Sequence, residues 1–331
     1  MVPFSILDLS PVAEGSTIRQ SLEGSARMAQ KAEEFGYKRF WLAEHHGMPG
    51  IASAATSIVI AHVGAATKRI RVGSGGIMLP NHSPLVIAEQ FGTLEALFPG
   101  RVDLGLGRAP GTDMRTAQAL RRNLDASHFP NDVVELQQLL GAPVENQAIL
   151  AVPGMNTNVP IWLLGSSLYS AQLAGMLGLP YAFASHFAPD SLLDALDIYR
   201  DRFQPSAVLD KPYAMVGVMG SVAETDEEAQ YHFTSAQQQF VNLRRNVRGQ
   251  FPRPVEDMES FWSPMEKMTV EHTLRYAVVG SQRTAEAKLS AFIKDTGADE
   301  VIISMPIHDI EARLKSVELF AGLGNFMRVA A

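Results

Sequence analysis

The sequence has 331 residues, 46% of them hydrophobic and 19% charged, a composition typical of a globular protein with a large core. Its 28 basic and 35 acidic residues give a net charge of −7 without any block of basic residues, which argues against nucleic acid and membrane surfaces as partners. The absence of cysteine excludes disulfides, thiolate metal sites and cysteine nucleophiles.

The sequence also lacks the signals that direct a chain to or across a membrane. No run of about 18 apolar residues is present, and the N-terminal segment has neither a basic start nor a long apolar stretch. We therefore expect a cytoplasmic protein. We find no linker, repeat or low-complexity segment, and since α/β barrels of about 250 residues or more fold as one domain, we expect a single domain over residues 1–331.

Short apolar segments alternate with longer helical patterns along most of the chain, and we predict a β-strand for each of them. They are Phe4–Leu9, Arg39–Leu42, Ile70–Met78, Val102–Leu106, Ile161–Leu164, Tyr181–Ala184, Ala214–Met219 and Glu300–Met305. Several are nearly continuous apolar runs, as parallel strands buried on both faces are. Eight strand–helix units favour a closed (β/α)8 TIM barrel of the α/β class over a doubly wound sheet.

Two segments are too long for a minimal barrel, and we predict them as insertions after strands 4 and 7. Residues 108–160 contain a predicted helix around Asn131–Leu140, and residues 248–283 contain three prolines and the aromatic residues Phe251, Phe261 and Trp262. Both follow strands, on the barrel face that carries chemistry in this fold. We expect residues 251–262 to form a mobile wall of the site.

The segment WLAEHH follows the second predicted strand and ends with Glu44, His45 and His46. Three interpretations are open. One imidazole titrates near neutral pH beside the reacting centre, with help from Glu44; the two histidines only hold a loop; or a zinc site includes His62 and His82 as well.

Two glycines interrupt the third predicted strand, in the segment VGSGGIMLP. Such glycines mark a bulge or the close approach of a ligand, or they relieve a bend in the barrel wall. Ser74, Gly75 and Gly76 are therefore candidate cofactor contacts.

The segment GLGRAPG follows the fourth predicted strand and lacks the third glycine of a dinucleotide-binding fingerprint. Arg108 in this segment is a candidate ligand for an anion, and an ion pair with Asp113 is the structural alternative.

The segment LGSSLYS joins the fifth predicted strand to a helix. Free backbone N–H groups and the helix dipole favour an anion at such a junction, and the hydroxyl groups add donors. Ser166, Ser167, Leu168 and Ser170 are therefore candidate cofactor-binding residues. Simple N-capping accounts for one of the serines, and Gly280–Ser281 is a weaker rival site.

Taken together and in this order, these segments resemble the bacterial luciferase-like flavin monooxygenase family. The matching stretches are WLAEHH (41–46), VGSGGIMLPNHSPL (72–85), GRVDLGLGRAPGTD (100–113), LLGSSLYSAQLAGMLGLPYAF (163–183), SVAETDEEA (221–229), VVGS (278–281) and GADEVIIS (297–304). The resemblance covers nearly the whole chain, and it implies a (β/α)8 barrel with added segments.

The resemblance also implies roles for single residues. His45 matches a histidine that assists flavin–oxygen chemistry, with Glu44 before it as in the family. Gly75–Gly76 matches two small residues joined by a cis peptide under the flavin ring, and Arg108 matches an arginine at the flavin phosphate. Ser167 and Ser170 match phosphate-binding residues, whereas Ser166 stands where the luciferases proper carry glutamate, a departure that weakens the comparison with aldehyde luciferases.

The implied activity is that of an FMN-dependent monooxygenase, which uses reduced FMN and dioxygen to oxidise a small organic substrate, with aldehydes among the candidates. A separate flavin reductase would supply the reduced FMN, because the chain has no nicotinamide fingerprint. Three alternatives stay open: a deazaflavin-dependent oxidoreductase, a non-catalytic FMN-binding protein, and a metal-dependent hydrolase, for which we find no ligand set. No metal is predicted. We expect a homodimer, formed through apolar helices over residues 52–66 and 85–97.

Overall fold

The structure is a computed structural model that describes residues 2–109, 111–120 and 126–323. Its strands are β1 (Phe4–Asp8), β2 (Arg39–Leu42), β3 (Arg71–Met78), β4 (Val102–Gly107), β5 (Ile161–Gly165), β6 (Tyr181–Phe183), β7 (Ala214–Ala223), β8 (Val278–Ser281) and β9 (Glu300–Ser304). Strands β1 to β7 and β9 form a closed parallel barrel, because β6 pairs with β7, and β9 pairs with both β7 and β1. The predicted (β/α)8 barrel is confirmed.

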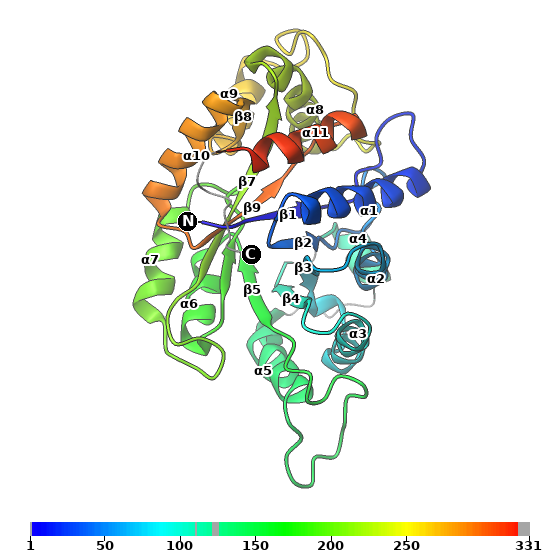
Figure 1. The fold of residues 1–331 in the computed structure, drawn as a ribbon, viewed down its shortest axis with the longest axis vertical. Helices are drawn as coiled ribbons and strands as arrows, with labels where there is room; N and C mark the ends of the chain where they lie inside the picture. Colours follow the sequence, from blue (N-terminus) through cyan, green and yellow to red (C-terminus); the bar gives the residue numbers. More distant parts are fainter. Residues whose placement is uncertain (1, 110, 121–125, 324–331) are drawn as a thin grey trace.

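Helices follow the strands and surround the barrel (Figure 1). They are α1 (Ile18–Glu34), α2 (Thr56–Ala66), η1 (Leu79–Asn81), α3 (Pro84–Leu97), α4 (Met114–Ala119), η2 (Ala126–His128), α5 (Phe129–Leu140), α6 (Leu168–Leu177), α7 (Leu192–Arg202), α8 (Asp226–Arg244), α9 (Pro264–Thr273), α10 (Gln282–Thr296) and α11 (Ile310–Ala321). Within the described ranges, none of them is long and apolar enough to span a membrane.

The eight predicted barrel strands agree with the observed ones to within one residue at each end, apart from the end of β7. Strand β7 continues to Ala223, and its last four residues pair with β8, which the sequence analysis did not identify. This pairing extends β7 beyond the barrel, where β8 adds a strand that belongs to the second insertion. A four-residue strand between two helices leaves too short an apolar run to separate from a loop.

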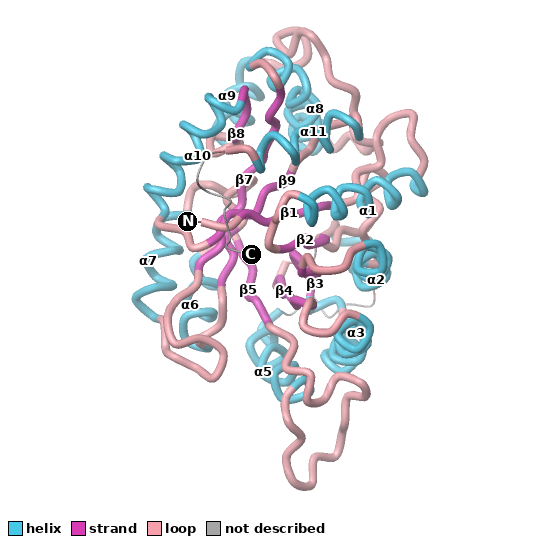
Figure 2. Tube along the Cα trace, viewed as in Figure 1, coloured by secondary structure: helices cyan, strands magenta, loops and turns pink. Residues whose placement is uncertain are grey.

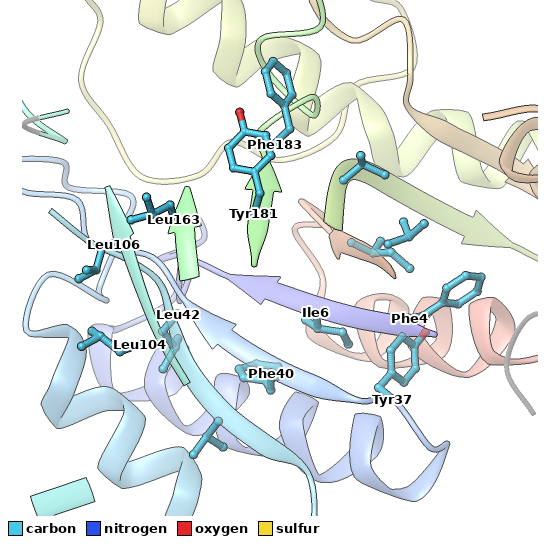
Figure 3. Close-up of a cluster of buried hydrophobic side chains, with 14 of the residues drawn as sticks. Phe4, Ile6, Tyr37, Phe40, Leu42, Leu104, Leu106, Leu163, Tyr181 and Phe183 are labelled. Carbon is cyan, nitrogen blue, oxygen red and sulfur yellow. The ribbon is translucent and has the colours of Figure 1, made fainter. Parts of the chain in front are cut away.

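The barrel wall is held by two hydrophobic clusters on its opposite faces. Phe40 and Leu42 of β2 belong to a large cluster that also contains Met28 of α1 and Val63 of α2, so they pack outward on the helices. Figure 3 shows this outer cluster, with labelled side chains from β1, β2, β4, β5 and β6. Trp41, which lies between Phe40 and Leu42, belongs to the smaller cluster that fills the inside of the barrel.

A buried network of charged side chains lies inside the barrel at the N-terminal ends of the strands. The Arg39 guanidinium donates to Asp103 of β4 and to Glu300 of β9, each at 2.7 Å. Arg71 also donates to Asp103, at 2.6 Å, and the Trp41 indole N–H donates to the same carboxylate at 3.1 Å. Burial lowers the pKa of Arg39, but the two carboxylates raise it above its ordinary value, so the cation stays charged. This end of the barrel is therefore closed by paired charges.

The predicted insertions after strands 4 and 7 are both present. The described part of the first contains α4, α5 and a long loop over residues 141–160, which Figure 2 shows between α5 and β5. The second contains α9 and β8, which lie together with α8 at the other end of the molecule (Figure 1). In it, Met258 and Trp262 are buried in a separate core against Phe233 of α8 and Val270 of α9. The segment expected to be a mobile wall thus packs its aromatic anchor into this core.

Candidate functional site

The loop after β2 is centred on the buried carboxylate of Glu44, which is 1% exposed. This carboxylate accepts hydrogen bonds from His46 Nε2 at 2.7 Å, His82 Nε2 at 2.9 Å and Asn81 Nδ2 at 3.0 Å. The Met78 backbone N–H donates to its second oxygen at 2.9 Å. Glu44 therefore joins the ends of β2 and β3 on the carboxyl face of the barrel.

The partners of Glu44 keep it ionised. Burial alone would raise the pKa of Glu44, but the hydrogen bond and charge of His82, with further bonds from Asn81 and His46, hold the pKa below its ordinary value. Because an ionised carboxylate only accepts, both imidazoles must donate through Nε2. The interpretation of a histidine that holds a loop thus fits His46, together with His82.

A zinc site on these histidines finds no support in the described part of the chain, where no group of three or more His, Asp or Glu side chains is arranged to hold a metal ion. His62 is not part of the Glu44 cluster, because it lines a groove on the outer helices, between α1 and α2, with Ile18 and Leu22.

His45 is arranged differently from its two neighbours in the sequence. Its ring is partly exposed, Nδ1 is shielded from solvent, and neither ring nitrogen has a hydrogen-bond partner among the described residues. Burial lowers the pKa of His45, the charge of Glu44 raises it, and His46 lowers it again, so that the pKa stays below its ordinary value. Glu44 thus acts on His45 through charge rather than through a hydrogen bond. A neutral imidazole at this position is able to donate or accept a proton.

The Gly75–Gly76 peptide at the end of β3 is cis, as the resemblance implies. The register between β3 and β4 shifts at this point, and the Gly76 carbonyl accepts the Glu44 N–H at 3.1 Å. A Cβ atom on Gly76 would lie 2.7 Å from the Gly105 carbonyl oxygen, so the wall has no room for a side chain there. The glycines therefore form a bulge that touches the Glu44 loop.

Ser74 is fully buried, and its hydroxyl group is used within the barrel wall. It donates to the Gly105 carbonyl at 2.9 Å and accepts the Gly105 N–H at 3.0 Å. The predicted cofactor contact of Ser74 therefore cannot come from its hydroxyl group as the structure has it.

Arg108 follows β4 and lies beside the first turn of α6. Its guanidinium carbon is 4.2 Å from the ring centroid of Tyr169, a cation–π distance. Asp113, the alternative partner considered above, instead pairs with Arg248 at 2.8 Å and caps α4 through the Thr116 N–H. The structure thus brings the predicted anion ligand Arg108 to the predicted phosphate site.

The start of α6 has no side-chain cap. Ser167 occupies the N-cap position, but its hydroxyl group makes no capping hydrogen bond, and Ser166, Ser167 and Leu168 are all exposed. Simple N-capping by Ser167 is therefore not what the structure shows. Backbone N–H groups at an uncapped helix start are ready donors for an anion.

Ser170 is buried, in contrast to the other candidates on this turn. Its hydroxyl group donates to the Ser167 carbonyl at 3.0 Å and lies 3.3 Å from the Tyr181 hydroxyl oxygen. A Cβ atom on Gly165 would overlap the Ser170 hydroxyl oxygen, so this glycine makes room for the turn. Ser170 therefore holds the turn in shape, and Ser167 is left to face a ligand.

The rival site at Gly280–Ser281 is already filled by a carboxylate of the chain itself. The Asp226 carboxylate accepts the Ser281 N–H at 2.6 Å and the Thr284 hydroxyl at 3.0 Å, and these bonds lower the pKa of Asp226. A second anion at the start of α10 would meet this negative charge. The start of α6 is thus the better phosphate site of the two.

The sequence profile of the luciferase-like monooxygenase family matches residues 2–300. The chain belongs to this family. Over 320 residues it is 53% identical to a protein of Escherichia coli strain K12 named luciferase-like monooxygenase, with 96% of each chain covered. Over 252 residues it is 34% identical to the N-acetyl-S-alkylcysteine monooxygenase of Bacillus subtilis, with 74% of this chain and 75% of the relative covered.

Solved structures share the fold of this family member. The crystal structure of apo-MsnO8 matches with a TM-score of 0.91 at 35% identity and covers 98% of both chains. The oxygenating constituent of 3,6-diketocamphane monooxygenase from Pseudomonas putida, in complex with FMN, matches at 0.71 with 17% identity and covers 100% of this chain and 99% of that one. An F420-dependent secondary alcohol dehydrogenase matches at 0.67 with 15% identity and covers 99% of both. At these low identities the last two show the fold alone.

His186 is a candidate site residue that the sequence analysis missed. It lies in the turn after β6, its Nδ1 is shielded from solvent without a partner, and burial together with the charge of His45 lowers its pKa to about 4. A histidine directly after a predicted barrel strand, in the sequence ASHF, was the available signal, because strand ends carry the chemistry in this fold.

Proposed function

We propose that this family member is an FMN-dependent monooxygenase, which oxidises a small organic substrate with reduced FMN and dioxygen. The observation that carries the proposal is the convergence of Arg108, Ser167 and the uncapped start of α6 at the barrel end where Glu44 and His45 also lie. One group of these residues suits a phosphate, and the other suits proton transfer.

The residues around α6 fit the phosphate of FMN in both charge and donors. Arg108 offers a cation, Ser167 offers a free hydroxyl group, and the first N–H groups of α6 add the positive end of a helix dipole. Ser170 fixes the turn that presents them. The flavin ring would then extend toward the Gly75–Gly76 bulge. Reduced FMN, when bound, supplies the electrons with which dioxygen is activated.

The proton chemistry falls to His45. Its lowered pKa keeps the imidazole neutral near pH 7, so that it can take a proton from a reacting group and return it. Glu44 fixes the loop that carries His45 by accepting hydrogen bonds from His46 of the same loop and from His82, which follows β3. The barrel and its second insertion would keep water away from the reacting centre.

The proposal also covers the partners, the location and the substrate class of the protein. A separate reductase would supply reduced FMN, and the protein would act in the cytoplasm as a homodimer. Aldehydes and thioethers are the first substrate classes to screen, because one relative is named as a monooxygenase of an S-alkylated cysteine. That activity belongs to the relative. A deazaflavin cofactor and flavin binding without catalysis remain as outcomes of the test.

The test measures how fast protein-bound reduced FMN is reoxidised by dioxygen, from the return of flavin absorbance in a stopped-flow instrument. We expect the parent to reoxidise the bound flavin at a rate that differs from free FMN and depends on pH. His45→Ala should bind FMN about as tightly, change this rate by about a hundredfold or more, and remove the part of its pH dependence that comes from this imidazole. A parent identical to free FMN contradicts the oxygenase function, and retention of a deazaflavin on purification would favour the alternative.

A further inference from the structure

His186 is placed beside the proposed reaction site by two features of the barrel wall. The Ser185 hydroxyl group donates to the Gly217 carbonyl at 2.6 Å, which ties the turn after β6 to β7. A Cβ atom on Gly217 would overlap Nδ1 of His186, so the imidazole lies in the space that this glycine leaves open. The ring is thus held against β7 by its Nδ1 edge.

His186 and His45 present the same unusual arrangement. Each ring is partly exposed, each has its Nδ1 shielded, and neither hydrogen-bonds to any residue in the described ranges. A shielded N–H without a partner costs more than a shielded lone pair. The proton therefore resides on Nε2, the ring nitrogen that is not shielded, and both rings present an N–H donor at the carboxyl end of the barrel.

The surroundings of His186 define what it can bind. Burial and the neighbouring His45 keep this imidazole neutral at pH 7, so it offers a hydrogen bond without a charge. The Phe187 ring meets it edge-on at 4.7 Å between centroids and is 47% exposed, which adds an apolar surface next to the donor. Arg108 and Ser167 follow other strands, so the phosphate and His186 do not compete for one position.

We propose that His186 is a substrate-binding residue, whose Nε2–H donates to a neutral carbonyl oxygen of a small apolar molecule held against Phe187 and beside His45. This inference rests on the proposed function, since it places the organic substrate next to the histidine that handles protons. A carboxylate would bind less well, because beside a neutral imidazole its charge would leave water without a paired countercharge, which costs more than the burial of a neutral carbonyl. Ser185 and Gly217 serve as positioning residues for the ring.

The test follows the ring-nitrogen NMR signals of His186 in protein that carries isotope-labelled histidine and bound oxidised FMN. The probes are cyclohexanone, a neutral carbonyl compound, and cyclohexanecarboxylate, its charged counterpart. We expect cyclohexanone to shift the His186 Nε2 signal saturably and to bind about tenfold more tightly than the carboxylate. His186→Phe, which removes the donor, should weaken cyclohexanone binding by up to about tenfold, and His186→Gln, which keeps an N–H donor, should restore most of it.

Two results would overturn the proposal. One is a His186 signal that does not move at saturating cyclohexanone, and the other is a signal that FMN alone shifts as far as the probe does, since His186 would then contact the cofactor. Failure of the proposed function shows separately, as a protein that binds no FMN. In that case the same cyclohexanone titration on the flavin-free protein still decides whether His186 binds a carbonyl group.

Discussion

The Arg108 guanidinium lies over the ring of Tyr169, 4.2 Å from its centroid, and this contact holds a cation that follows β4 beside the first turn of α6. Tyr169 is itself in that turn, one residue before the buried Ser170. The stacking therefore fixes the cation relative to the free helix start, in an arrangement that needs no ligand to form. A preformed site of this kind loses little side-chain entropy when an anion binds.

We predict that Arg108→Gln weakens FMN binding by about ten- to a hundredfold, because a hydrogen bond to a charged group contributes about 1.5–3 kcal/mol. Riboflavin, which lacks the phosphate, should bind nearly as well as it binds to the parent. Titration of flavin fluorescence measures both affinities. Arg248→Gln, at an exposed ion pair with Asp113, is the matched control and should change neither. Equal losses for FMN and riboflavin would show that Arg108 does not meet the phosphate.

The two serines of the α6 turn should respond differently to substitution by alanine. Ser167→Ala should reduce FMN affinity by about tenfold and leave stability unchanged, because its hydroxyl group makes no capping hydrogen bond in the described part of the chain. Ser170→Ala should lower the free energy of unfolding by about 1 kcal/mol, since it removes the bond to the Ser167 carbonyl. Flavin titration and urea denaturation separate these effects, and a loss of FMN affinity confined to Ser170→Ala would reverse the assignment.

The α6 turn also shows how far the sequence alone reaches. The sequence predicted an anion site at this junction from a strand, a glycine, several serines and a helix that follow one another. These signals are readable because they all lie within a few residues of each other. The sequence did not predict which serine holds the turn and which faces a ligand. That difference depends on a contact between Ser170 and Tyr181, eleven residues later on β6. The barrel itself followed from the apolar strand pattern, whereas β8 did not, since its pairing with the extended end of β7 joins residues more than fifty positions apart.

The histidines at the ends of β2, β3 and β6 also have contacts that the sequence did not predict. Adjacent His45 and His46 are equivalent in the sequence, and only the fold reveals that His46 donates to Glu44 whereas His45 makes no hydrogen bond to any described residue. His82, which follows β3, also donates to Glu44, and His186 lies in the turn after β6. Contacts between side chains that follow different strands depend on how the closed sheet brings the strand ends together. The strand pattern in the sequence predicts the order of the strands but not which side chains meet.

We predict that Glu44→Gln lowers the free energy of unfolding by about 2 kcal/mol. The amide keeps one acceptor oxygen where the carboxylate accepts from His46, His82, Asn81 and the Met78 N–H, so buried donors lose their partner. The substitution also removes the negative charge that raises the pKa of His45, so this pKa should fall further. Urea denaturation and NMR titration of His45 measure the two effects, and a rise in the pKa of His45 would contradict the argument.

The buried charges at the other end of the barrel should be sensitive to truncation. Arg39→Met leaves the carboxylates of Asp103 and Glu300 without their central cation, and removing one member of a buried ion pair costs about 3–5 kcal/mol. Arg27→Met, at an exposed ion pair with Glu311, is the control and should cost less than about 1 kcal/mol. Urea denaturation compares them, and a small effect of Arg39→Met would mean that water enters the barrel to solvate the acids.

The lowered pKa of His186 makes a prediction about acid stability. Its value of about 4 in the folded protein lies below the ordinary value of about 6.5, so the unfolded chain binds a proton first as the pH falls. The parent should therefore lose stability between about pH 6.5 and 4, and His186→Gln should lose about 2 kcal/mol less by about pH 4.5. His272→Gln, at an exposed histidine, is the control. Identical pH profiles for the parent and His186→Gln would contradict an imidazole that stays neutral in the folded protein.

The expected homodimer also makes a measurable prediction through exposed apolar residues on the outer helices. Ile58 of α2 is 70% exposed and Ile18 of α1 is 62% exposed, and both line one groove between these helices. Leu97, at the end of the neighbouring helix α3, is 60% exposed. Burying such side chains against a second copy removes apolar area from water, which favours association. Light scattering at micromolar concentration should therefore give about twice the chain mass of 36.0 kDa.

Ile58→Lys should shift the protein toward the monomer, because a dimer would place two such charges in an apolar interface. Leu243→Lys, at a residue on α8 that is 59% exposed, is the matched control and should leave the mass unchanged. A parent mass of 36.0 kDa would rule out the dimer, and a dimer that survives Ile58→Lys would place the interface elsewhere.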